Sequence, residues 1–130
     1  MATPFNLLGT LLLPGTPGLS PEPLPFGMAS AYDAKAEFEL VLPDAVGTKV
    51  VDFTAIPTAG AKLLLLLFTG TPPVSGGEPP PIAVTLNAAA AHEITSGGCI
   101  CLGSPKPVAG LIALSIAYTA AGKVRIWLLG

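Results

Sequence analysis

The sequence predicts an all-β protein, an antiparallel jelly-roll or Greek-key β-sandwich of about seven or eight strands with an extended, proline-rich N-terminal arm. Three observations predict it. Short runs of alternating apolar and polar residues recur along the chain, turn residues separate these runs, and no segment has the period and caps of an amphipathic helix. We therefore divide the chain into an arm, residues 1–33, and a β-sandwich domain, residues 34–130.

The composition supports one domain whose surface carries little charge. The 130 residues, 13.0 kDa in mass, suffice for a single hydrophobic core but not for two ordinary domains. Hydrophobic residues make up 51% of the chain and charged residues only 11%, against about one quarter charged in globular proteins. We therefore expect something other than water to cover part of the surface.

The arm, residues 1–33, is apolar but interrupted by proline about every few positions. Proline fixes φ and removes a backbone donor, so neither a helix nor a central strand is expected here. Disordered tails are usually polar, whereas this segment is not. We expect it to become ordered across a neighbouring subunit, with apolar interface residues Phe5, Leu7, Leu8, Leu11, Leu12 and Leu13.

Three strands are predicted in the first half of the domain. Residues 34–42 alternate apolar with charged side chains, which is typical of a strand with one wet face. Residues 49–56 form a second apolar run that ends at a turn. Residues 62–68 are apolar on both faces, which predicts a central strand covered on each side.

A long loop and the remaining strands follow. Residues 69–81 are rich in Pro and Gly and predict an exposed, partly polyproline loop, in which Pro79, Pro80 and Pro81 are candidate contact residues. Further strands are predicted at residues 82–86, 93–95, 99–102, 108–118 and 124–129. A helix is the alternative for residues 109–121, but strict alternation of apolar with small or polar residues favours the strand.

Membrane, secretory and nucleic-acid roles are not predicted. No apolar run approaches the roughly 20 residues of a membrane-spanning helix. The first basic residue is Lys35, so the N-terminus lacks the positive region of a secretory signal and we expect no targeting segment. The net charge is −2 and the basic residues are scattered, which disfavours nucleic-acid binding.

No constellation of catalytic, cofactor-binding or metal-binding residues is found, so we expect no enzyme and no cofactor. Glu37 and Glu39 belong to the wet face of a strand, and His92 is the only histidine. Ser104 lies in Gly-Ser-Pro rather than in a nucleophile elbow. Gly76 and Gly77 are followed by Glu and Pro, which is not a phosphate-binding loop.

Three other side chains have structural interpretations. Cys99 and Cys101 are two residues apart on a predicted strand, where a mutual disulfide would be strained, so we interpret them as small buried hydrophobes. Trp127 shares a face with Arg125, and both residue types are enriched at interfaces. Trp127 is therefore either an interface anchor or the closing residue of the core.

The order of segments resembles that of small β-sandwich virion proteins of tailed bacteriophages. The resemblance is carried by LLLLLF at 63–68, IAVTLN at 82–87, CICLG at 99–103 after a Gly-Gly turn, the strand from Gly110 to Tyr118, and VRIWLLG at 124–130. It covers about residues 34–130. The loop at 69–81 is longer than the turn such proteins have.

The resemblance implies a virion protein, assembled in the host cytoplasm, that decorates or cements a capsid. Its partners would be further copies of itself, a trimer being one arrangement, and a major capsid or other virion protein. The alternatives are a tail or head–tail accessory protein, or a carbohydrate-binding or receptor-binding sandwich module. The module is second because aromatic residues are only 6% of the chain and many fall on core faces. An enzyme subunit without its own active site is a third class that no residue favours.

Overall fold

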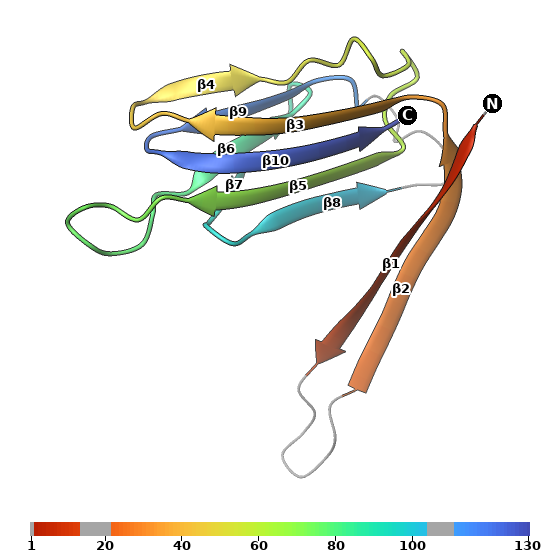
Figure 1. Ribbon diagram of the computed structural model, residues 1–130, viewed down its shortest axis with the longest axis horizontal. Helices are drawn as coiled ribbons and strands as arrows, with labels where there is room; N and C mark the ends of the chain where they lie inside the picture. The colour runs from red at the N-terminus through yellow and green to blue at the C-terminus, as the bar shows by residue number, and fades with distance from the viewer. Residues whose placement is uncertain (1, 14–21, 104–110) are drawn as a thin grey trace.

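The structure, a computed structural model, describes residues 2–13, 22–103 and 111–130. Within these residues there are ten strands in three antiparallel sheets (Figure 1). No helix in this part of the chain is long and apolar enough to cross a membrane. The strands are β1 (Thr3–Leu13), β2 (Glu22–Tyr32), β3 (Lys35–Leu42), β4 (Gly47–Val50), β5 (Leu63–Gly70), β6 (Ile82–Leu86), β7 (His92–Ile94), β8 (Cys99–Gly103), β9 (Leu114–Tyr118) and β10 (Gly122–Leu129).

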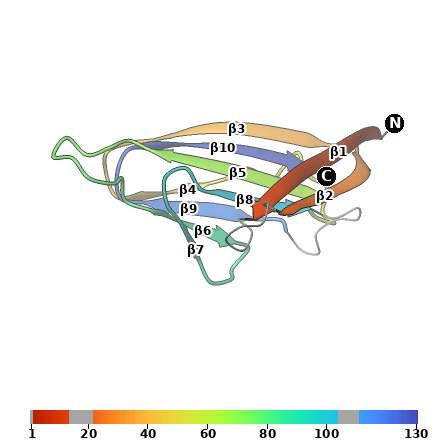
Figure 2. The same ribbon diagram turned by 90° about the horizontal axis from the view of Figure 1, so that it is seen from below.

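Two four-stranded sheets form the body of the molecule. Their strand orders are β3-β10-β5-β8 and β4-β9-β6-β7, and every neighbouring pair is antiparallel. The sheets lie as two layers, one over the other (Figure 2). The all-β prediction is confirmed, and the layers are consistent with a β-sandwich.

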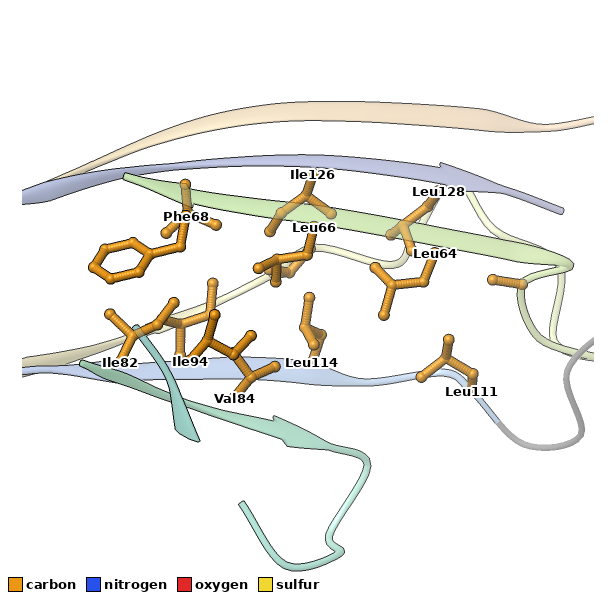
Figure 3. Close-up of a cluster of buried hydrophobic side chains, with 14 of the residues drawn as sticks. Leu64, Leu66, Phe68, Ile82, Val84, Ile94, Leu111, Leu114, Ile126 and Leu128 are labelled. Atoms are coloured by element: carbon orange, nitrogen blue, oxygen red, sulfur yellow. The ribbon is translucent and has the colours of Figure 1, made fainter. Parts of the chain in front are cut away.

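The hydrophobic core lies between these layers because the strands alternate apolar residues inward. Leu64, Leu66 and Phe68 of β5 point toward Val84 of β6 and Leu114 of β9 (Figure 3). Leu64, Leu66 and Val84 have no exposed surface. Each such side chain contributes about 1.5–3 kcal/mol through burial.

The second predicted strand, residues 49–56, is wrong beyond Val50, where β4 ends. The carboxylate of Asp52 accepts hydrogen bonds from the backbone N–H and the hydroxyl of Thr54, at 2.8 and 2.7 Å. This local bonding replaces a strand ladder with a turn. The N–H of Ile56 then donates to the carbonyl of Phe53, which continues the irregular path.

The predicted strand 108–118 is also shorter than expected, because β9 begins only at Leu114. Residues 108–110 are outside the described residues, and 111–113 are not in a strand. The side-chain oxygen of Asn87 accepts hydrogen bonds from the N–H groups of Ile112 and Ala113, both at 3.1 Å. These amides are therefore bonded to a turn side chain rather than to a neighbouring strand.

The remaining sheet is a hairpin in the segment for which an arm is predicted. β1 pairs with β2 from Thr3 opposite Tyr32 to Leu13 opposite Glu22. Each of the two strands has only the other as a partner among the described residues, which suits a proline-rich segment because edge strands tolerate proline. The hairpin projects from one end of the two layers (Figure 1).

The base of the hairpin is attached to the body by backbone and side-chain contacts. The N–H groups of Asp33 and Ala34 donate to the carbonyl of Gly130, at 2.8 and 3.0 Å. The ammonium group of Lys62 donates to the carbonyl of Ala31 at 2.6 Å. These bonds fix where the hairpin leaves the body but not its far end.

Candidate interaction surfaces

The hairpin has one half-buried and one exposed face where its side chains are described. Phe5 and Leu7 are half-buried, and the ring of Phe5 lies 6.0 Å from that of Tyr32. Leu8, on the opposite face, is 80% exposed. The candidates Leu11, Leu12 and Leu13 lie in β1, but their side chains are outside the described residues.

One glycine allows the hairpin to approach the body closely. A Cβ atom at Gly103, the last residue of β8, would lie 3.0 Å from the sulfur of Met28 in β2. Met28 therefore packs directly over the end of β8. A larger residue at 103 would require the Met28 side chain to shift.

The loop between β5 and β6 forms a second projection, at the opposite end of the molecule from the hairpin (Figure 1). Val74 at its tip is fully exposed, and Gly76 and Gly77 have φ values of 85° and 94° that favour glycine. The N–H of Gly76 donates to the carbonyl of Pro73 and closes a turn. The exposed part of the loop is therefore its tip.

The candidate contact residues Pro79, Pro80 and Pro81 are half-buried rather than at this tip. A Cβ atom at Gly70 would clash with the Pro79 side chain, so this proline lies against the end of β5. A hydrogen bond also restrains this end of β5, because the hydroxyl oxygen of Ser96 accepts the N–H of Gly70 at 2.8 Å. Pro79 therefore packs this end of the loop against the body.

The outer face of the sheet β3-β10-β5-β8 carries the third surface. The guanidinium carbon of Arg125 lies 4.9 Å from the centre of the Trp127 ring, within the range of a cation–π contact. Trp127 is half-buried and points outward, so it does not close the core. Leu65 is its partner on β5, and Leu67 is the partner of Arg125.

The prediction that residues 62–68 are covered on both faces is wrong. Leu64 and Leu66 point into the core, whereas Leu65 is half-buried and Leu67 is 38% exposed. An apolar run shows that both faces avoid charge, but it cannot show whether a layer of the same chain covers each of them. Here the outer face remains open at Leu67.

The two cysteines extend this outer face, and their interpretation as buried hydrophobes is wrong. Cys99 and Cys101 are both exposed free thiols, opposite Leu67 and Leu65 on β5. Partial desolvation of the Cys101 thiol and, secondarily, the neighbouring Cys99 raise its pKa above the ordinary value. We call Leu65, Leu67, Cys99, Cys101 and Trp127 the outer strip.

Charged residues of β3, together with Lys123 of β10, border the outer strip. Lys35 pairs with Glu37 at 3.2 Å and Lys123 with Glu39 at 3.0 Å, and all four side chains are about half exposed. Exposed ion pairs of this kind contribute only about 0–1 kcal/mol. Glu37 and Glu39 are therefore the solvated carboxylates that the alternating pattern predicts.

The described residues contain no group of three or more His, Cys, Asp or Glu side chains that could hold a metal ion. His92 is exposed at the start of β7. Ser104 is outside the described residues. The hairpin, the loop between β5 and β6 and the outer strip therefore offer mainly apolar side chains and backbone groups to a partner.

Comparisons of the chain with protein-family models, with curated protein sequences and with solved structures return no match. The sequence singled out the apolar arm, the loop and the Arg125–Trp127 pair. It did not predict that the arm pairs as the hairpin β1–β2, and it missed the outer strip. The available signal for the outer strip was the spacing of Cys99 and Cys101, which places both on one face of a strand, in a chain that also has an all-apolar strand at 63–68.

Proposed function

We propose that the chain is a non-enzymatic virion structural protein that decorates or cements a phage capsid through its hairpin arm and its 71–81 loop. The observation that carries the proposal is the strand order β3-β10-β5-β8 facing β4-β9-β6-β7, with an apolar hairpin projecting from one end. We assign this order to a jelly roll, an architecture used by viral capsid and lectin domains.

The distribution of burial supports a docking role for the hairpin. All buried apolar side chains of the described residues lie between Leu42 and Leu129, so none belongs to the hairpin. A two-stranded hairpin is at best marginally stable alone in water, and its apolar residues gain most when another surface covers them. A capsid supplies that surface many times, because symmetry repeats each shallow contact.

A carbohydrate-binding module is the second candidate, because Trp127 lies beside Glu37 and could combine an aromatic platform with a carboxylate. Its weakness is the position of Arg125, whose guanidinium occupies one face of the ring at 4.9 Å. A sugar stacking on that face would have to displace it. The capsid role is therefore preferred.

The test is retention on particles from the biological source of the chain. Particles stripped of the chain are incubated with the full chain, with a variant that begins at Asp33, and with Val74→Ser at the loop tip, then examined by electron microscopy and mass analysis. All described residues of the core cluster remain in the variant that begins at Asp33, so its fold is expected to survive.

We expect the full chain to occupy regular sites on the shell and the variant without the hairpin to be washed off. Val74→Ser should be retained but reduced, since it alters one contact of the second projection. A full chain that binds no shell, or that binds immobilised glycans instead, contradicts the proposal. Regular sites on the tail would assign the tail accessory role in its place.

A further inference from the structure

The open strand edges of the molecule differ in how they are protected. A strand at the end of a sheet has a row of backbone N–H and C=O groups that a strand of another chain can pair with. The four-stranded sheets end in β3, β8, β4 and β7. Natural proteins block such edges with charge, proline or short length.

Three of these four edges carry such devices. β3 presents Lys35, Glu37 and Glu39 along its exposed face. β4 has four residues including Lys49, and β7 has three including Glu93. Pairing with another chain at these edges would bury charge or gain few backbone bonds.

β8 is the exception. Its five residues, Cys99–Gly103, include no charged residue and no proline. The N–H of Phe68 donates to the carbonyl of Gly98. In an antiparallel pair the backbone groups of alternate residues point to the partner strand, so those of Ile100 and Leu102 point toward β5. The backbone groups of Cys99 and Cys101 therefore point to the open edge.

β1 provides the second unprotected edge. Its eleven residues carry no charge, and Pro4 is their only proline. Its partner β2 has Glu22, Pro23 and Pro25. Of the two strands of the hairpin, β1 is thus the one that can add to another sheet.

We infer that β1 of one copy of the chain pairs with β8 of a second copy and so extends the sheet β3-β10-β5-β8 by the hairpin. Both edges are uncharged, and the outer strip would continue onto the apolar side chains of the added strand. The occupant is a second copy because the hairpin is attached through Gly130 and Lys62 at the end of its own body and projects away from it (Figure 1).

The contact would be heterologous, since two different surfaces meet. Such contacts close into a ring or continue as an open array, according to the rotation between copies. The inference deepens the proposed function, and it rests on that function for the idea that the hairpin is a docking element. It concerns the chain by itself, so it is tested without particles.

The experiment tests the two edges separately in purified protein under reducing conditions. We call β1, which is added, the donor edge, and β8, which receives it, the acceptor edge. Cys101→Pro removes an outward N–H and leaves the bonds to β5 intact, so it retains only the donor edge β1. The chain that begins at Asp33 retains only the acceptor edge β8. Cys101→Ser is the matched control, because it keeps the N–H. Masses are measured by sedimentation.

We expect the intact chain and Cys101→Ser to form oligomers that dissociate on dilution. Cys101→Pro and the chain that begins at Asp33 should each sediment as monomers, the former at 13.0 kDa. A mixture of the two should form a one-to-one complex. Cys101→Lys, which places a charge at the same edge, repeats the test if the proline variant does not fold.

Three outcomes overturn the inference. Self-association of the chain that begins at Asp33 would assign the contact to two β8 edges. Self-association of both Cys101→Pro and Cys101→Lys would assign it to two hairpins. An intact chain that remains a monomer at its highest soluble concentration would show that no copy accepts the hairpin. Loss of particle retention with normal self-association would contradict the proposed function alone.

Discussion

The hairpin β1–β2 and the two four-stranded sheets are built from equally apolar sequence, but they use it differently. In the body, Leu64, Leu66 and Ile126 have no exposed surface. In the hairpin, Phe5 and Leu7 are half-buried and Leu8 is 80% exposed. The difference teaches that apolar composition alone does not define a core. The body covers its apolar residues itself, whereas none of the described side chains of the hairpin is fully buried.

The largest expected effect is the difference in stability between a truncated core side chain and a truncated hairpin side chain. Leu66→Ala should lower the free energy of unfolding by about 2–5 kcal/mol, because it leaves a cavity between the layers. Leu8→Ala should change it by no more than about 0.5 kcal/mol, because Leu8 is exposed. Both values are measured by denaturant unfolding of the dilute chain. Equal losses would mean that the hairpin is part of the cooperative core.

The next effect concerns the turn that shortens β9. Asn87→Ala should cost about 1–3 kcal/mol, because it removes the acceptor for two backbone N–H groups and places alanine at a φ of 55°. Asn87→Gly should cost less, since glycine tolerates this φ. Asn87→Asp keeps the acceptor oxygen and should be closest to the parent chain. A melting temperature that is higher for Asn87→Ala than for Asn87→Gly would show that backbone strain at this position is not important.

A smaller effect is expected in the titration of the outer strip. The pKa of Cys101 is raised, so its alkylation rate should reach half-maximum at a higher pH in the folded chain than in the chain unfolded by denaturant. Cys99→Ser should remove only part of this difference, because burial is the larger cause. Mass spectrometry of alkylated peptides gives the rates. No change on unfolding would contradict the partial burial of this thiol.

The smallest effect is the pH dependence from Asp52. Hydrogen bonds from the backbone and the hydroxyl of Thr54 lower the pKa of Asp52 below its ordinary value of 3.8. Its stabilising contribution is therefore present above that value and is lost as the pH falls through the lowered pKa. The stability difference between the parent chain and Asp52→Asn should shrink below pH 3.8. A difference that is constant with pH would contradict the turn.

Alternation was sufficient to predict most strands of the body. The runs at 34–42, 82–86 and 124–129 correspond to β3, β6 and β10, because each has one face in the core and one in water. It failed at 49–56 and 111–113, where the side chains of Asp52 and Asn87 bond to backbone amides. Such competition depends on the geometry of a turn, which a hydrophobic pattern does not record.

The interaction surfaces were predicted less completely. The apolar arm and the Arg125–Trp127 pair are visible as local sequence features, but the pairing of β1 with β2 depends on contacts between residues up to 29 positions apart. The outer strip depends on the order of strands in the sheet, which brings Cys99 beside Leu67. The prolines of the loop were misplaced because Gly70, nine residues away from Pro79, decides how closely they pack.

Hydrogen–deuterium exchange, compared between the dilute chain and the assembled chain, tests the central claim most directly. The account predicts that amides of 3–13, 22–32, Cys99 and Cys101 exchange rapidly in the dilute chain and become protected on assembly. Amides of β5 and β10 should be protected in both states, since they lie inside the sheet. A hairpin already as protected as β5 in the dilute chain, with no gain on assembly, would contradict the claim that it awaits a partner.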